Sequence, residues 1–126
     1  MPIMSNGPHQ SRLRFRLVLG GSIAIGPGKA DMLAAIAETG SISAAGRSMG
    51  MSYKKAWYLI DTMNSCFREP LVVASKGGSS RGGAQLTTMG QTVLDLYRAI
   101  ESEAGLAAER HLNAFSQLIV EQPPKQ

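Results

Sequence analysis

The sequence predicts a mainly helical domain that carries small β-hairpins, and three observations predict this fold class. Apolar residues recur at helical spacing within residues 29–39, 53–66 and 88–118. Short alternating or apolar stretches bounded by glycines lie near residues 13–25 and 71–87, as expected of hairpins. The chain has 126 residues, which suits one domain with one modest core.

The composition indicates a globular protein with a basic front part. Hydrophobic residues make up 44% of the chain and charged residues 17%, which excludes a disordered profile. Residues 1–87 hold ten Lys or Arg against four Asp or Glu, a balance of +6, whereas residues 88–126 hold three against five, a balance of −2. The front two thirds therefore favour an acidic partner such as nucleic acid.

Residues 1–11 combine Pro, Gly, Asn and Ser without periodicity, so we expect a flexible N-terminal arm. After it, apolar side chains alternate with basic ones, the pattern of a strand with one buried face. The apolar set is Leu13, Phe15, Leu17 and Leu19, and the basic set is Arg12, Arg14 and Arg16. A second strand over residues 22–25 follows the Gly20-Gly21 turn. A solvated face is the more common role for such arginines, and phosphate contact is the alternative.

Three helices are expected next. The first covers residues 29–39 and ends at Gly40. A short second helix begins at Ser41 or Ser43, both good N-cap residues, and runs to about Met49. Ser52 caps a third helix, expected from Tyr53 to Cys66, whose apolar face is formed by Ala56, Leu59, Ile60, Met63 and Phe67.

A second hairpin and a long helix complete the chain. Strands are expected at residues 71–74 and 84–87, joined by a Gly-rich basic loop. Thr88 and Gln91 form a capping-box pair at the start of a helix over residues 88–118, and Gly105 marks a kink or the point where one helix becomes two. The predicted organisation is an arm (1–11), a domain (12–87), the long helix (88–118) and a tail (119–126).

The long helix carries an apolar stripe that its own domain is too small to cover. An unbroken helix of residues 88–118 would be about 46 Å long at about 1.5 Å per residue. We therefore expect a partner chain to cover it, with His111 at the seam between the two chains. The stripe consists of Met89, Val93, Leu96, Tyr97, Ile100, Ala104, Ala107, His111, Phe115 and Leu118.

The order of elements is that of a winged helix-turn-helix with an added N-terminal hairpin. Gly46 is small where the two motif helices approach, Gly50 suits their turn, and Ala56 faces the first motif helix. Basic and polar residues then occupy the start of the recognition helix, the end that enters the major groove. We assign to DNA binding the residues Ser43, Arg47, Ser52, Tyr53, Lys54, Lys55 and Tyr58, with Lys76, Ser79, Ser80 and Arg81 on the wing. Trp57 is assigned to packing.

Residues 40–64 (GSISAAGRSMGMSYKKAWYLIDTMN) and 86–97 (LTTMGQTVLDLY) resemble the DNA-binding domain of the ModE family of molybdate-responsive bacterial transcription regulators. The broader LysR group shares only the helix-turn-helix and the long helix. The resemblance implies a homodimer joined through the first strands and the long helix. The dimer contacts then include Leu13, Phe15, Leu17, Val93, Tyr97, Ile100, Ala104, Ala107 and His111.

ModE proteins continue into molybdate-binding β-barrels, whereas this sequence ends at Gln126, so we expect no cofactor in this chain. A separate sensor protein, another effector and constitutive action remain open. The leading hypothesis is a dimeric repressor that binds double-stranded DNA at a palindromic operator in the bacterial cytoplasm. The alternative is a winged-helix protein-interaction module. We do not expect an enzyme, because no nucleophile–base set or metal-ligand spacing is present.

The single cysteine, Cys66, excludes an internal disulfide and suits a reducing compartment. No apolar stretch approaches the length of about 20 residues that a membrane span needs. We therefore expect a protein without a membrane anchor.

Overall fold

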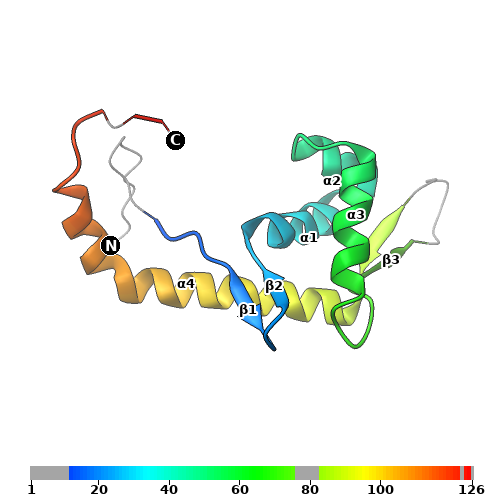
Figure 1. The fold of residues 1–126 in the computed structure, drawn as a ribbon. Coiled ribbons are helices and arrows are strands. Elements are labelled where there is room, and N and C mark those ends of the chain that lie inside the picture. The colour runs from blue at the N-terminus through cyan, green and yellow to red at the C-terminus, as the bar shows by residue number, and fades with distance from the viewer. Residues whose placement is uncertain (1–11, 76–82, 123, 126) are drawn as a thin grey trace. The chain divides into compact units, whose positions relative to one another are not determined.

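The computed structural model describes residues 12–75, 83–122 and 124–125. These residues form a hairpin, three helices, a second hairpin and a long helix, which confirms the predicted fold class (Figure 1). In chain order the elements are β1 (Leu17–Leu19), β2 (Ile23–Ile25), α1 (Pro27–Thr39), α2 (Ile42–Ser48), α3 (Tyr53–Asn64), β3 (Val72–Ala74), β4 (Ala84–Leu86) and α4 (Thr88–Ser116).

The described residues divide into two compact units. Phe15–Arg98 form one unit, and residues 12–14 with those from Ala99 onward form the other. The helix-turn-helix, both hairpins and the first turns of α4 all belong to the Phe15–Arg98 unit.

The first hairpin is shorter than the sequence pattern predicts. β1 and β2 pair antiparallel with Leu17 opposite Ile25, across a turn in which Gly20 and Gly21 have φ of 60° and 86°. The strand expected from Leu13 is paired only over Leu17–Leu19, because β2 supplies just three residues before α1 begins. The predicted buried face is correspondingly incomplete, since Leu13 and Leu19 are exposed.

Helices α1 and α3 differ slightly from their predicted bounds. α1 begins at Pro27 rather than residue 29, because proline suits the first position of a helix, where its missing N–H is not needed. It ends at Gly40, whose φ of 70° confirms the predicted left-handed cap. α3 begins as predicted but ends at Asn64 rather than Cys66, because the Cys66 N–H donates to the Met63 carbonyl three residues earlier instead of continuing the α-helical i−4 pattern.

The second hairpin is tied to the start of α2. β3 and β4 pair antiparallel, with the register Val72 to Leu86. Where β4 begins, at the loop end of this hairpin, the Ala84 N–H donates to the Gly40 carbonyl at 2.9 Å, and Ser41 and Gly83 form an isolated bridge. The wing is therefore anchored to the turn that precedes α2.

The cap of α4 is Thr87, so the predicted Thr88–Gln91 capping box is wrong. The Thr87 hydroxyl accepts from the Gly90 N–H at 2.9 Å and donates to the Pro70 carbonyl at 2.7 Å. Gln91 instead donates from its side chain to Asp95 at 2.9 Å. Thr87 therefore joins the start of α4 to the segment that leads into β3.

The start of α4 lies directly against Leu71. A Cβ added at Gly90 would overlap the Leu71 carbonyl oxygen and lie 3.0 Å from the carbonyl carbon. Further along, α4 continues through Gly105 without a break.

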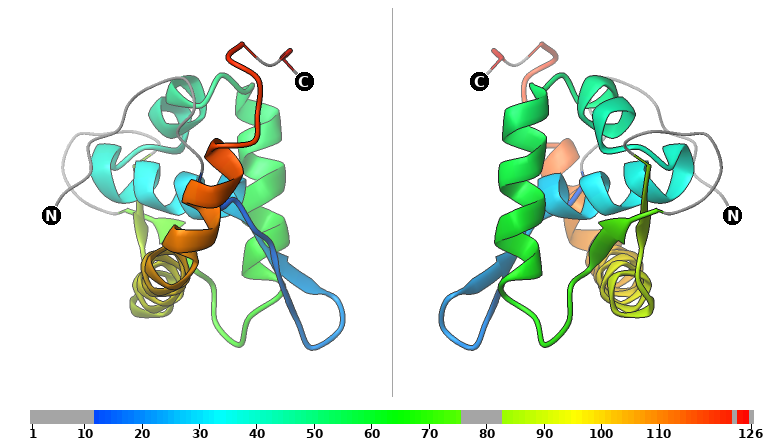
Figure 2. Two further views of the ribbon diagram at one scale, coloured as in Figure 1. Left: turned by 90° about the vertical axis from the view of Figure 1, so that its left-hand side faces the viewer. Right: turned by 90° about the vertical axis from the view of Figure 1, so that its right-hand side faces the viewer.

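The core of the Phe15–Arg98 unit lies between α1, α3 and the start of α4, with α3 running crosswise to α1 (Figure 2). The apolar face predicted for α3 is confirmed in its centre, since Ala56, Ile60 and Met63 are buried. The buried hydrophobic residues are Ile25, Ala30, Met32, Leu33, Ile36, Ile42, Ala45, Ala56, Ile60, Met63, Leu71, Val72, Ala84, Leu94 and Tyr97.

Candidate nucleic-acid interface

The turn between α2 and α3 depends on two glycines, as the sequence predicts. A Cβ at Gly46 would lie 3.2 Å from the Cβ of Ala56, so the two helices touch at this point. Gly50 has φ of 69°, a conformation that L side chains rarely adopt. The Met51 N–H closes the turn by donating to the Gly46 carbonyl at 3.0 Å. The residue pattern Gly46, Gly50 and Ala56 thus fixes how α3 is presented.

Serine side chains cap both helices of the motif. The Ser41 hydroxyl accepts from the Ala44 N–H at 3.0 Å, and the Ser52 hydroxyl accepts from the Lys55 N–H at 3.1 Å. Ser43, the alternative cap, lies inside α2 instead. Because Ser52 satisfies one backbone donor, α3 starts sharply at Tyr53.

The outer face of α3 is open. Successive residues of a helix are rotated by about 100°, so Lys54 and Tyr58 lie opposite the buried Ala56 and Ile60. Tyr58 keeps 68% of its surface exposed, and both Lys54 and Lys55 are exposed. The start of α3 therefore presents two ammonium groups and a phenol to any ligand on this side.

Two further aromatic side chains flank that face. Tyr53 and Trp57 pack edge to face with ring centroids 6.3 Å apart, and 56% and 38% of their surfaces are exposed. Trp57 was expected to pack, and it does so against Tyr53 at the surface rather than within the core. The pair is an i,i+4 contact along the first turn of α3, next to Lys54.

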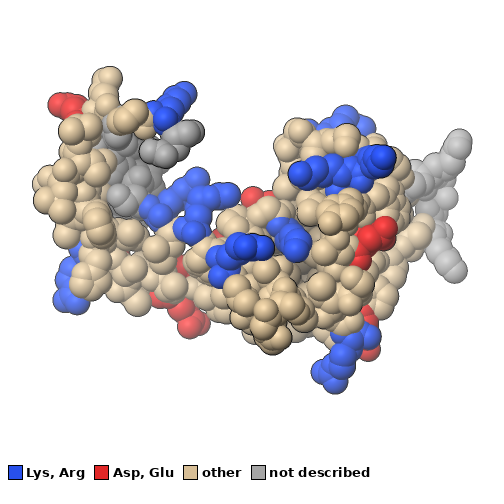
Figure 3. Space-filling view, viewed as in Figure 1, with Lys and Arg blue, Asp and Glu red and all other residues tan. Residues whose placement is uncertain are grey.

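α2 adds another basic group near this surface. Arg47 is exposed and donates from Nη1 to the Ser43 hydroxyl at 3.1 Å, which orients the guanidinium along α2. Figure 3 shows Lys and Arg atoms gathered over the region of α2 and the start of α3. Arg47, Lys54 and Lys55 are all exposed, and Lys54 and Lys55 line one shallow groove with Ser52, Tyr58 and Leu59.

These cations have no carboxylate partner within the described residues. The ion pair found there joins Arg98 to Asp31 at 3.0 Å. Asp61, in the second half of α3, does not pair with Lys54 or Lys55. An anionic ligand on this surface would therefore displace no internal salt bridge. Among residues 12–75, 83–122 and 124–125 there is also no group of three side chains able to hold a metal ion.

Asn64 holds the wing against the end of α3, a role the sequence reasoning missed. Its side-chain oxygen accepts from the N–H groups of Leu71 and Val72 at 2.8 and 3.2 Å, and its amide donates to the Val72 carbonyl at 3.1 Å. An asparagine at a helix C-terminus gives no local sign of such distant partners. The predicted wing contacts Lys76, Ser79, Ser80 and Arg81 lie outside the described residues and stay predictions.

Residues 29–91 match the family model described as bacterial regulatory helix-turn-helix protein, lysR family. This chain belongs to that family. The matched region runs from the first turn of α1 to the first turn of α4, so it includes every described element of the interface. No helix in the described part of this LysR-family chain is both long and apolar enough to cross a membrane.

Curated relatives of this LysR-family chain carry molybdenum-related names. It is 47% identical over 83 residues to the molybdenum-pterin-binding protein MopB of Rhodobacter capsulatus, covering 66% of this chain and 30% of that protein. It is 47% identical over 79 residues to the molybdenum transport protein ModE of Azotobacter vinelandii, covering 63% and 29%. With the DNA-binding transcriptional dual regulator ModE of Escherichia coli (strain K12) it shares 38% over 88 residues, covering 70% and 34%.

The predicted resemblance to ModE proteins is thus confirmed, and the chain spans about a third of the length of these relatives. Among solved structures, it is similar to the CbnR_DBD-DNA complex with a TM-score of 0.54 at 23% identity, covering 69% of this chain and 94% of that chain. Full-length CbnR complexed with its target DNA gives 0.51 at 23% identity, covering 67% and 27%. These likenesses confirm the winged helix-turn-helix fold.

The residues predicted to join two copies of this LysR-family chain differ in exposure. Ile100 is 40% exposed, and Ala107 and His111 are exposed on the same helix. Leu13 is 37% exposed, whereas Leu17, Val93 and Ala104 are half-buried. Of these residues, Ile100, Ala107 and His111 are therefore uncovered on α4 in the single chain.

Tyr97 is not among these uncovered residues. It is 2% exposed, its hydroxyl donates to the Phe15 carbonyl at 2.8 Å, and its ring lies 5.3 Å from that of half-buried Phe15. With Gly90 and Leu94 it forms the face of α4 that packs on its own domain. Tyr97 therefore has no surface to offer a second chain, and Leu94 is a core residue that the predicted stripe omitted.

Proposed function

We propose that this protein is a sequence-specific transcription regulator that binds double-stranded DNA through α3. The observation that carries the proposal is the start of α3, where Ser52 caps the helix and Lys54 and Lys55 are exposed without carboxylate partners. A helix-turn-helix places this end of its second helix against base edges in the major groove. Arg47 and Ser43 on α2 then face the backbone phosphates. The CbnR_DBD-DNA complex, a similar fold, supports this reading.

Docking of this kind needs no resident cofactor, because hydrogen bonds and ion pairs supply the binding energy. The names of the curated relatives lead us to propose that the controlled genes concern molybdenum. Bound over a promoter, the protein would act as a repressor by excluding other proteins from the same DNA. A regulator of a bacterial operator works in the cytoplasm, at the nucleoid.

The test of DNA binding uses the protein's own upstream promoter fragment and a scrambled fragment of equal length in fluorescence-anisotropy titrations at several salt concentrations. We expect preference for the promoter fragment. We also expect Lys54→Ala with Lys55→Ala to weaken binding and to lower the slope of log K against log salt by about 1 for each lysine that contacts a phosphate. Circular dichroism checks that the variant is folded.

The matched control is Arg68→Ala with Arg110→Ala, which removes the same charge from exposed positions outside the motif. We expect this control to bind almost as the parent does. Equal binding of the two fragments by the parent would refute sequence-specific regulation and favour the protein-interaction module. Equal losses in both double variants would show that only net charge matters.

We further propose that the functional form is a homodimer that pairs through the exposed stripe of α4. Leu96 is 61% exposed, Ile100 40% and Phe115 63%, and helical geometry places them within about 100° of one another around the helix axis. A two-fold dimer with two recognition helices favours a palindromic operator.

The dimer is tested by sedimentation. Ile100→Glu inserts a charge into the stripe and is expected to shift the protein to a monomer and to weaken operator binding. Ser102→Glu adds the same charge on the other side of α4 and is expected to leave the dimer intact. A parent protein that sediments as a monomer at concentrations where it binds the operator would overturn the dimer.

Repeating the promoter titration with and without molybdate tests the link to molybdenum. An affinity that molybdate leaves unchanged would point to a separate sensor protein, another effector or constitutive action. A molybdate-dependent shift in affinity would instead assign the sensing to this chain.

A further inference from the structure

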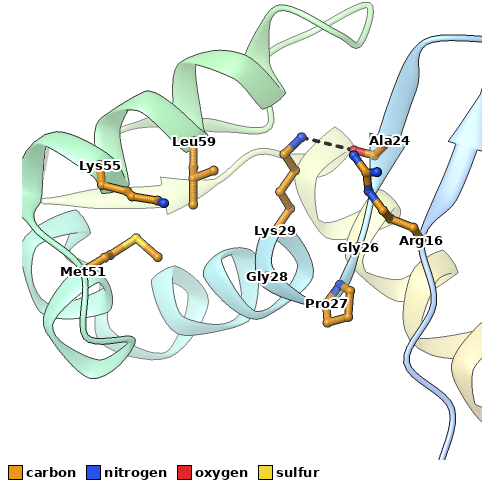
Figure 4. A pocket seen from close by; sticks show the side chains of 9 residues that line it. All are labelled: Arg16, Ala24, Gly26, Pro27, Gly28, Lys29, Met51, Lys55 and Leu59. Carbon is orange, nitrogen blue, oxygen red and sulfur yellow. Dashed lines mark hydrogen bonds between the residues drawn. The ribbon is translucent and has the colours of Figure 1, made fainter. Parts of the chain in front are cut away.

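A cavity beside the recognition face of α3 is lined by three basic groups and by no acidic one. It lies between the first hairpin, the start of α1 and the inner flank of α3, and it has a volume of about 380 Å³. Arg16 reaches it from beside β1, Lys29 from the first turn of α1 and Lys55 from the first turn of α3 (Figure 4). Its other lining residues are Ala24, Gly26, Pro27, Gly28, Met51 and Leu59.

The three cations have no counter-charge in this cavity. None of the lining residues is acidic, and none of the three forms an ion pair with a described carboxylate. Lys29 donates to the Ala24 carbonyl at 3.2 Å, and Figure 4 shows the Arg16 side chain on the same hairpin side of the cavity. One neutral carbonyl cannot balance the positive charges of this lining, so an anion bound among them would lower their mutual repulsion.

The arrangement of Arg16 depends on a specific contact. A Cβ added at Gly26 would lie 3.1 Å from Cγ of Arg16, so the missing side chain at Gly26 lets the arginine stem lie over the start of α1. Gly26 is also the N-cap of α1 and offers no side-chain cap. At Gly28 a Cβ would meet nothing within 4 Å, so the backbone there is open to a ligand.

Backbone donors complete the lining. The first helical hydrogen bond of α1 runs from the Ala30 N–H to the Gly26 carbonyl, and Pro27 has no N–H. The N–H groups of Gly28 and Lys29 are thus left for a ligand, at the end of the helix that favours negative charge. Two N–H donors, one guanidinium and two ammonium groups suit a tetrahedral oxyanion with several acceptor oxygens.

We propose that this cavity is a phosphate-type oxyanion site, occupied in the DNA complex by a backbone phosphate beside the base pairs read by α3. The shallow groove lined by Ser52, Lys54, Lys55, Tyr58 and Leu59 shares Lys55 and Leu59 with the cavity, so the two surfaces are continuous. The inference rests on the proposed DNA binding for the source of the phosphate, but not for the chemistry of the site. The first hairpin thereby becomes a second DNA-contacting element.

The first arm of the test measures DNA binding by the full chain carrying Arg16→Gln with Lys29→Gln. We expect the slope of log K against log salt to become less steep by about 0.9 for each phosphate contact that is lost. The loss of affinity between 50 and 200 mM salt is then about 3.5-fold smaller for each lost contact. Discrimination between promoter and scrambled DNA is expected to stay the same. Arg68→Gln with Arg110→Gln, an equal charge change elsewhere, is expected to leave the slope almost unaltered.

The second arm titrates inorganic phosphate into the isotopically labelled protein without DNA and follows the amide resonances of Gly28 and Lys29 by NMR. Saturable shifts that vanish in the Arg16, Lys29 double variant are expected. The single variant Arg16→Gln separates loss of the site from loss of the fold, because its exposed side chain makes no hydrogen bond to a described residue; circular dichroism is expected to show that it stays folded.

The two arms separate the sources of the anion. A lowered salt slope assigns the site to a DNA phosphate, and saturable phosphate binding with an unchanged slope assigns it to a free oxyanion. An unchanged slope together with no saturable phosphate shift would overturn the proposal, as would an equal loss of slope in the Arg68, Arg110 control. If the parent protein binds no DNA, the proposed function fails and the phosphate titration still decides this site.

Discussion

Replacing Gly90 by alanine tests how closely α4 approaches the strand segment at Leu71. The new Cβ would overlap the Leu71 carbonyl oxygen and lie 3.0 and 3.2 Å from its carbonyl carbon and Cα. These are backbone atoms of a residue with 0% exposure, so neither a rotamer change nor a surface shift relieves the overlap. The same carbonyl accepts the Thr87 N–H at 2.9 Å, a bond that any displacement would strain.

The expected loss follows from two opposing effects. Overpacking a core costs about 1–3 kcal/mol, and the rigid surroundings place this site near the upper end. Alanine in a helix interior regains about 1 kcal/mol relative to glycine. Gly90→Ala should therefore lower the free energy of unfolding by about 2 kcal/mol, which for a chain of this size lowers Tm by about 8 °C.

Gly105→Ala is the matched control in the same helix. A Cβ at Gly105 meets nothing within 4 Å, so only the propensity gain remains, and the variant should be more stable by up to about 1 kcal/mol. Both variants are compared with the parent by thermal unfolding under far-UV circular dichroism, at one protein concentration because a dimer's Tm depends on it. A Gly90→Ala protein as stable as the parent would refute the close approach.

Three other side chains give predictions of the same kind, each measured by urea unfolding. Asn64→Ala should cost about 2–3 kcal/mol because it leaves partly buried backbone groups of β3 without partners, whereas Asn64→Asp keeps the acceptor oxygen and should cost less. Ser52→Ala should cost about 1 kcal/mol and Ser52→Asp almost nothing; equal losses would exclude a capping role. Tyr97→Phe should cost about 1 kcal/mol through the bond to Phe15, and an unchanged midpoint would show that this bond contributes nothing.

The sequence predicted those features that depend on neighbours along the chain. Gly40 and Gly50 were identified because left-handed turns favour glycine, and Gly46 and Ala56 because two crossing helices need small residues where they touch. Ser52 was identified as a cap because its hydroxyl bonds only three residues ahead.

Features that depend on residues far apart in the sequence could not be predicted from local patterns. The local pattern favours Thr88, which has Gln91 three residues ahead, but the bond to the Pro70 carbonyl seventeen residues earlier positions Thr87 as the cap. The basic alternation that begins at Arg12 suggested a long strand, but the short β2 limits the pairing. Arg16 and Lys29 meet Lys55 only after the hairpin, α1 and α3 have packed, so their shared cavity has no linear signature.

The contacts of Thr87 make the junction between the wing and α4 a stiff joint. Its backbone and hydroxyl together bond to Pro70, Leu71 and Gly90, so the hairpin strands and the first turn of α4 cannot rotate independently. A load applied to the first turn of α4 would therefore pass to the wing strands through Thr87 instead of being absorbed by a flexible linker. Loosening this joint, as in Thr87→Val, would let the wing strands shift against α4 while the helix-turn-helix keeps its own turn at Gly50.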